Sequence, residues 1–101
     1  MYLYNITIKV DWSIHDDWLR WMNEEHIAQI LSYNNFHRYS LYKILNIDES
    51  DGPTYALQLF AESKALYNSF IEIHLHSINQ IQKEHWGSKM LSFSTLMEIV
   101  Y

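Results

Sequence analysis

Residues 2–10 read YLYNITIKV and alternate between two kinds of side chain with a period of two. One set of alternate positions is apolar or aromatic from Tyr2 to Val10, and the other set carries Asn5 and Thr7. This alternation is typical of a β-strand with one face in the core. The core is therefore expected on the side of the apolar set.

Two later segments place apolar residues at helical spacing. The first runs from about Ile14 to Ser32, and Ser13 or Asp11 is expected to cap it. The second runs from a cap at Ser63 to about His85, where the following Trp86-Gly87 ends the helix.

Three more strands are expected, and they are Arg38–Ile47, Thr54–Glu62 and Leu91–Tyr101. A polar turn at residues 48–53 joins the first two into a hairpin, and replacing its Gly52 or Pro53 is expected to cost little stability. The order βαββαβ predicts an α+β, ferredoxin-like domain over residues 1–101. Its four-stranded antiparallel sheet has both helices on one face.

The composition excludes several classes of function. The 101 residues fit a single domain, and a net charge of −5 with seven Lys and Arg argues against nucleic-acid and anionic membrane partners. The chain has no cysteine, so thiolate catalysis and disulfides are excluded. No signal peptide or membrane span is recognisable, which favours a soluble cytoplasmic protein.

The sheet face opposite the helices is expected to be weakly charged. Its predicted residues are Asn5, Thr7, Ser40, Tyr42, Gln58, Phe60, Ser92 and Ser94. One interpretation is an ordinary half-exposed sheet. We favour a second, in which two sheets pack face to face in a homodimer, because an exposed aromatic sheet is prone to associate.

Two histidines lie in the middle of apolar helical stripes. His26 shares a stripe with Leu19 and Met22, and His74 shares one with Phe70 and Ile78. One interpretation is a pair of buried rings, each satisfied by a carbonyl or a tyrosine hydroxyl. The other is a pocket in the helix–sheet layer, lined by Asn5, Trp18, Trp21, Met22 and Phe70, with His26 and His74 as catalytic candidates.

A metal site is not expected from these histidines. His74 and His76 are two residues apart, which turns them about 200° away from each other on a helix. An ion bridging His26 and His74 would lack a recognisable third ligand.

Several motifs resemble one known family. They are Tyr4-Asn-Ile-Thr-Ile8, Trp18-Leu-Arg-Trp-Met22 with His26, Thr54-Tyr55, Ala61-Glu-Ser63, His74, and Trp86-Gly-Ser-Lys89 with Phe93 and Thr95. The chain is similar to a small bacterial family, domain of unknown function 4286, and through it to the dimeric α/β-barrel superfamily. The resemblance implies a ferredoxin-like fold, sheets paired across a homodimer and a pocket between helices and sheet.

Two departures from the related chains stand out. Prolines that often follow the two helical histidines are replaced here by Ala28 and His76, which favours straighter helices. Haem-degrading members of the superfamily use an asparagine, a tryptophan and a histidine. Asn5 and His74 fit that pattern, but no tryptophan lies at a comparable point before His74, so no cofactor is expected.

Two functions of different class are consistent with the sequence. The first is a non-catalytic homodimeric module that binds a small apolar or aromatic ligand or a protein partner. The second is a cofactor-independent monooxygenase or isomerase, with His26 as general base and His74 or Asn5 orienting the substrate.

Overall fold

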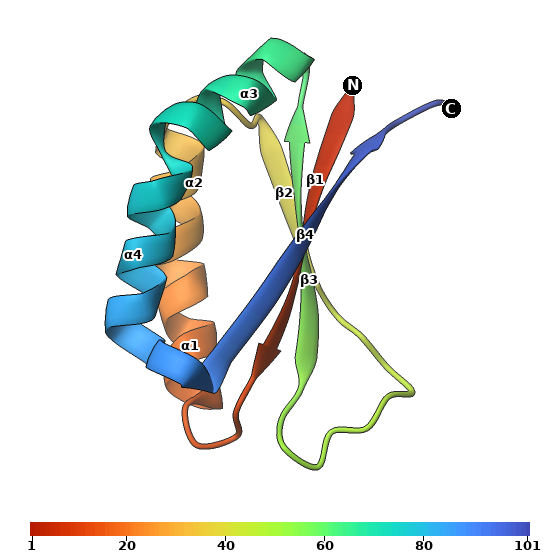
Figure 1. Cartoon of the computed structure of the whole chain (residues 1–101). Helices are drawn as coiled ribbons and strands as arrows, with labels where there is room; N and C mark the ends of the chain where they lie inside the picture. Colours follow the sequence, from red (N-terminus) through yellow and green to blue (C-terminus); the bar gives the residue numbers. More distant parts are fainter.

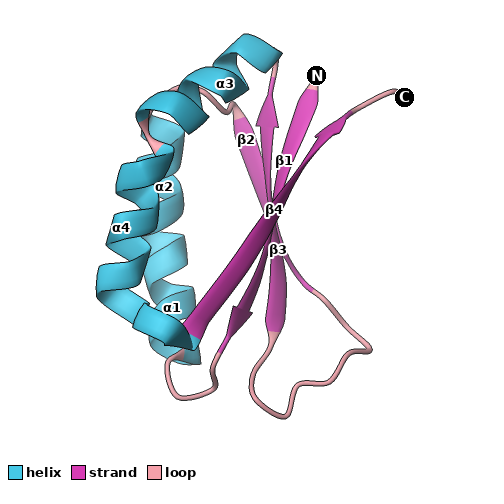
Figure 2. Ribbon diagram, in the orientation of Figure 1, coloured by secondary structure: helices cyan, strands magenta, loops and turns pink.

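The computed structural model describes residues 1–101 as one sheet with a single layer of helices (Figures 1 and 2). The strands are β1 (Tyr2–Val10), β2 (Arg38–Lys43), β3 (Thr54–Ala61) and β4 (Met90–Glu98). The helices are α1 (His15–Trp21), α2 (Ile27–Ser32), α3 (Lys64–Ile73) and α4 (Leu75–Trp86). A π-helical turn (Met22–His26) joins α1 to α2, and a 3₁₀ turn (Gly87–Lys89) joins α4 to β4.

The strand order is β2-β3-β1-β4, and every neighbouring pair is antiparallel. All helices cover the same face of the sheet, and the opposite face is bare (Figure 1). This arrangement confirms the predicted ferredoxin-like fold. Two strands are shorter at their C-terminal ends than predicted. β2 ends at Lys43 and not at Ile47, and β4 ends at Glu98 and not at Tyr101. No helix is long and apolar enough to cross a membrane.

The core lies between the helices and the inner face of the sheet. The apolar set of β1 supplies Tyr4, Ile8 and Val10, which are all buried, as the alternation predicts. The helical side contributes Trp18, Met22, Ile27, Ile30, Phe70 and Ile78 to the same cluster. Burial of this apolar surface is the main source of stability in a domain of this size.

Local signals place several helix ends correctly. The backbone N–H of Leu66 donates to the Ser63 hydroxyl at 3.1 Å, so Ser63 caps α3 as expected. Gly87 has a positive φ of 58° directly after α4. The expected cap of the first helix is wrong, because the Asp11 carboxylate instead accepts the Ser13 N–H at 2.8 Å and forms a turn before the helix.

Neither helical segment is straight, contrary to the expectation from Ala28 and His76. The first contains the π-helical turn that ends at His26, and π turns add one residue and are frequent at functional sites. The second breaks at His74, whose φ of −112° separates α3 from α4. Both irregularities are thus present in this chain without a proline in either helical segment.

The pairing of β4 with β1 reverses the expected position of two serines. Ser92 lies opposite Ile8 and Ser94 lies opposite Ile6, so both serines face the helices and not the open face. The open face of β4 carries instead the intervening residues Leu91, Phe93, Thr95 and Met97. The prediction failed because β4 has polar residues inside and apolar residues outside, the reverse of β1.

The expectation that Gly52 could be replaced at little cost is also wrong. Gly52 is buried where the β2–β3 connection approaches the end of β1, and Pro53 accepts a hydrogen bond from the Val10 N–H. A Cβ on Gly52 would lie 1.7 Å from the Val10 carbonyl oxygen, far inside contact distance. The loop backbone therefore needs glycine at this position.

We predict that Gly52→Ala lowers the free energy of unfolding by about 2–3 kcal/mol, because the β1 backbone must move to admit the methyl group. Urea unfolding followed by circular dichroism measures the effect. Leu45→Ala is the matched control, since Leu45 is 70% exposed in the same connection. Equal stability of the two variants would contradict the prediction.

Candidate functional site

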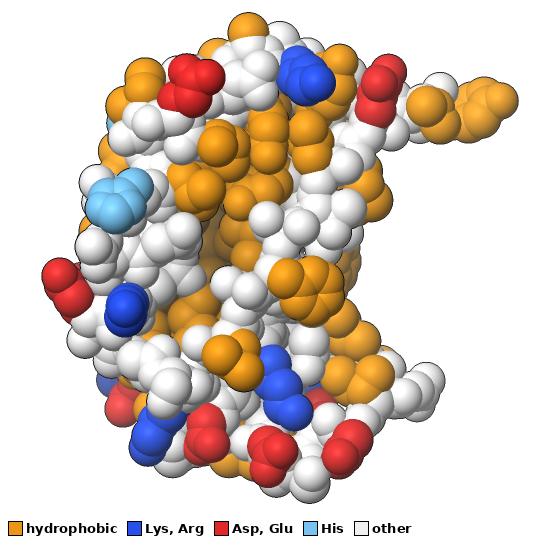
Figure 3. All heavy atoms as spheres, in the orientation of Figure 1, with side chains coloured by type: hydrophobic (Ala, Val, Ile, Leu, Met, Phe, Trp, Pro, Cys, Tyr) orange, Lys and Arg blue, Asp and Glu red, His pale blue; other side chains and the backbone are white.

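A cavity of about 170 Å³ lies between the helices and the inner face of the sheet, beside the edge strand β4. Figure 3 looks at this edge and shows a hollow between the helical side and the strand side. The floor of the cavity is apolar, and its residues are Ile6, Ile8, Met22, Ile30, Leu57, Phe70, Leu75 and Ile78. The sheet and both helical segments therefore contribute to one site.

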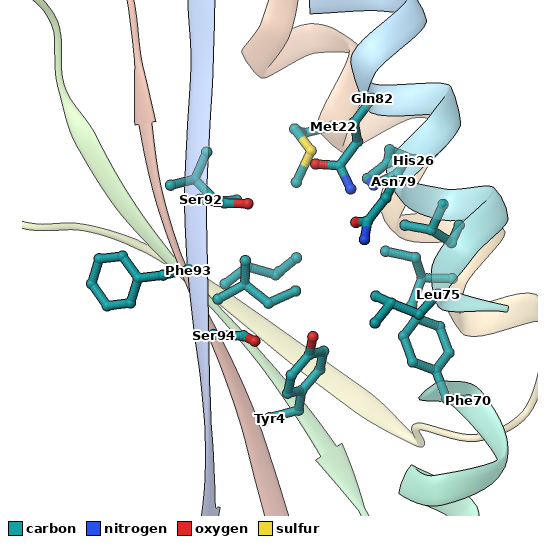
Figure 4. A pocket seen from close by; sticks show the side chains of 15 residues that line it. Tyr4, Met22, His26, Phe70, Leu75, Asn79, Gln82, Ser92, Phe93 and Ser94 are labelled. Atoms are coloured by element: carbon teal, nitrogen blue, oxygen red, sulfur yellow. The ribbon is translucent and has the colours of Figure 1, made fainter. Parts of the chain in front are cut away.

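The rim of the cavity is polar. Asn79 and Gln82 approach it from α4, one turn apart on the face that looks at the sheet, and Ser92 and Ser94 approach it from β4 (Figure 4). The hydroxyl group of Tyr4 also points into the space in this view. Hydrogen-bonding groups thus surround an apolar floor, as in many small-molecule sites.

His26 is a buried polar residue of this site. Its side chain is 3% exposed, and its Nδ1 is buried without a hydrogen-bond partner in the protein. The ring of Trp21 stacks on it, with 4.2 Å between centroids and 20° between planes. This stacking fixes the imidazole ring at the cavity wall.

Burial determines the charge of His26. Burial, and to a smaller extent the positive charge of nearby His85, lower the pKa of the imidazole from 6.5 to about 4. His26 is therefore neutral at pH 7. A neutral imidazole has one N–H donor and one nitrogen acceptor to offer a ligand.

The structure brings together three of the seven residues predicted for the site. His26, Met22 and Phe70 line the cavity. Trp21 lies behind His26, and Trp18 is fully buried against Tyr55 at 5.2 Å between ring centroids, so neither lines it.

The other two predicted residues lie elsewhere. Asn5 is out of phase with Tyr4 and Ile6 on β1, so it faces the open side of the sheet, where its amide donates to Thr7 at 3.2 Å. The ring of His74 stacks on Tyr33 with 3.7 Å between centroids, away from the cavity. The two candidate catalytic histidines therefore do not share a site.

Comparisons with known proteins place the chain in a family. Residues 1–100 match the family model described as "Domain of unknown function (DUF4286)". The chain belongs to this family. A comparison of the sequence with curated proteins found no match.

Two solved structures are similar to this DUF4286 domain, and each is titled a dimeric ferredoxin-like protein from an uncultured marine organism. The first has a TM-score of 0.68 and 8% identity, and the match covers 99% of this chain and 95% of the other. The second has a TM-score of 0.68 and 16% identity, and the match covers 100% and 96%. At these identities the likeness shows the fold.

Sequence reasoning missed the polar rim of the DUF4286 domain. Asn79 and Gln82 follow the apolar residues Leu75 and Ile78 on one helical face, and this change from apolar to polar along one face was the available signal. Ser92 and Ser94 gave no comparable signal, because their direction depends on the pairing with β1.

The residues around the cavity define its chemistry. None of the residues that line it is Lys, Arg, Asp or Glu. No group of three or more His, Asp or Glu side chains in the chain is placed to hold a metal ion. The site can therefore enclose an apolar group and form hydrogen bonds to an uncharged polar atom attached to it.

We predict that the buried His26 makes stability depend on pH. In the unfolded chain its pKa is near 6.5, so between pH 6.5 and about 4 the unfolded state takes up a proton that the folded state does not. The free energy of unfolding should fall by about 3 kcal/mol in total as the pH falls through this window.

Urea unfolding at pH 7.0, 5.5 and 4.5 measures the slope of the free energy of unfolding against pH. His26→Leu should flatten it, whereas His76→Gln, a change at an exposed histidine, should leave it unchanged. A His26→Leu variant with the slope of the wild type would show that another group is responsible.

Proposed function

We propose that this DUF4286 domain is a homodimeric module that binds a small, uncharged, mainly apolar group in the cavity beside His26. The observation that carries the proposal is the imidazole Nδ1, which is buried at the wall of an apolar cavity without a partner in the protein. A buried polar atom without a hydrogen bond costs about 1–3 kcal/mol. A ligand that bonds to this nitrogen recovers that cost.

The size of the cavity favours a single ring. A cavity of about 150 Å³ lined by apolar side chains accepts benzene, and the volume here is about 170 Å³. An aromatic or compact branched group fits this space, and one hydroxyl or carbonyl group on it could reach the polar rim.

The charge of the lining favours a neutral group. Moving an ion into an apolar site without an opposite charge is far more costly than moving a neutral polar group. His26 is neutral at pH 7 and no other ionisable side chain of the helices or of β4 lines the cavity. The part of the ligand that enters the cavity is therefore uncharged.

Binding is favoured over base catalysis by two observations. A general base works best with a pKa near the working pH, whereas burial lowers the pKa of His26 to about 4. The second candidate residue, His74, is stacked on Tyr33 outside the cavity. His26 fits the role of a hydrogen-bonding partner.

The open face of the sheet supports a homodimer. Tyr42, Leu91, Phe93 and Met97 are 40–67% exposed there. Two cations, Lys9 and Arg38, lie on the same face, and the Arg38 guanidinium is 4.0 Å from the Phe60 ring. A large apolar face with so little charge fits association with a second copy. Two solved structures of similar fold are titled dimeric, which supports a homodimer.

We predict that phenol enters the cavity and changes the methyl signal of Met22. With ¹³C-labelled methionine methyl groups the chain gives four NMR signals, and Met22 lies in the cavity while Met97 lies on the open face. Phenol titration should shift the signal of Met22 and leave that of Met97 in place.

The matched variants for this test are Ser94→Leu and Thr95→Leu. Ser94 faces the cavity and Thr95 faces the opposite side of the same strand. The first change fills the cavity and should abolish the phenol shift, and the second should preserve it. A Met22 signal that does not respond to phenol in the wild type would overturn the ligand-binding proposal.

We predict that Phe93→Lys converts the dimer to a monomer, because it places a charge in the proposed interface. Light scattering at micromolar concentration should give twice the 12.2 kDa chain mass for the wild type and the chain mass for the variant. Ile73→Lys, at a residue that is 65% exposed on α3, is the control and should stay dimeric. A monomeric wild type would exclude the homodimer.

A further inference from the structure

A second hollow of about 420 Å³ continues from the cavity toward solvent. The two spaces share three wall residues, Asn79 and Gln82 from α4 and Ser92 from β4. The remaining walls of the outer hollow are Lys83, Gly87, Ser88 and Met90. The apolar cavity and the polar groove therefore adjoin, and the two amides and one hydroxyl group that they share form the neck between them.

Lys83 is the charged side chain of this groove. No Asp or Glu lines the cavity or the groove, and the Lys83 ammonium takes part in none of the ion pairs of the protein. A cation without a counter-charge at the mouth of an otherwise neutral site attracts an anion, and the effective dielectric constant beside the protein surface strengthens the attraction relative to bulk water.

The spacing on α4 places this cation at a defined distance from the neck. Lys83 follows Asn79 by four residues, so it lies on the same side of the helix, about 6 Å further along the axis. The groove stays open beyond it, because a Cβ added to Gly87 would meet no atom within 4 Å. A chain of several bonds would extend from the neck to the ammonium group.

We propose that the ligand is an amphiphilic carboxylic acid, with an apolar ring in the cavity, a flexible chain through the neck and a carboxylate at Lys83. This inference rests on the proposed ligand-binding function and adds the chemical class of the ligand. The neutral ring fills the apolar cavity beside His26, and the amides of Asn79 and Gln82 flank the chain. The carboxylate stays partly hydrated in the groove, so its desolvation cost is small.

The test compares acids with matched alcohols as probes. The probes are phenylacetate, 3-phenylpropanoate, 4-phenylbutyrate and 5-phenylpentanoate, each with the alcohol of the same length. Affinities come from titrations of the ¹³C-methyl signal of Met22, which reports on the inner cavity. Beyond a minimum chain length, the acid should bind about two- to five-fold more tightly than its alcohol, as expected for one partly exposed ion pair.

Charge variants test whether Lys83 causes the preference for the acid over the alcohol. Lys83→Gln should bring the affinity of the acid down to that of the alcohol without changing the affinity of the alcohol. Lys83→Glu should make the acid the weaker ligand of the pair. Lys64→Gln, which removes an exposed lysine from the start of α3, is the control and should preserve the preference for the acid.

The outcomes separate this inference from the proposed function. If phenol and the alcohols shift the NMR signal of Met22, the cavity binds ligands. If Lys83→Gln then leaves the ratio of the acid affinity to the alcohol affinity unchanged, the assignment of Lys83 is wrong. If the preference for the acid is the same at every chain length, the carboxylate does not reach Lys83. If neither phenol nor any acid or alcohol shifts Met22, both proposals fall.

Discussion

The register between β1 and β4 is the constraint on which the site depends. It directs Ser92 and Ser94, and not the neighbouring Leu91 and Phe93, toward the helices. Serine side chains are too small and too polar to fill the layer between sheet and helix, so α4 faces them with amides and a cavity is left between. The apolar residues that would have filled this space point outward, where they form part of the open sheet face. One pairing thus determines both the cavity and the surface proposed for dimerisation.

The stacked pair of Trp21 and His26 turns this space into a specific site. Trp21 stacks on the imidazole, which lines the cavity; the ring is buried, so it stays neutral, and its Nδ1 lacks a protein partner. The π-helical turn that ends at His26 sets the direction in which the ring leaves the helix. A histidine in this setting provides a hydrogen bond of fixed direction, and hydrogen bonds made in a water-poor site discriminate strongly between ligands with and without the matching group.

Much of the fold could be predicted from the sequence, because its signals are local. The alternation of residues 2–10, the polar turn before Thr54 and the cap at Ser63 each act within a few residues, and the order of elements then implies the topology. The site was predicted in part. Met22, His26 and Phe70 lie on helical stripes, which the sequence shows directly. Ser92, Ser94 and Gly52 depend on which backbone lies next to them in three dimensions, and no local pattern contains that information.

The position of β4 also bears on how a ligand could reach the floor of the cavity. β4 is an edge strand that hydrogen-bonds to β1 alone, and its middle residues are exposed on both faces of the isolated chain. Segments with few buried contacts open at a free energy well below that of global unfolding. Transient separation of this strand from α4 would widen the neck while the rest of the sheet stays paired. Ligand exchange through such an opening would follow the local fraying of one strand and not the global unfolding of the domain.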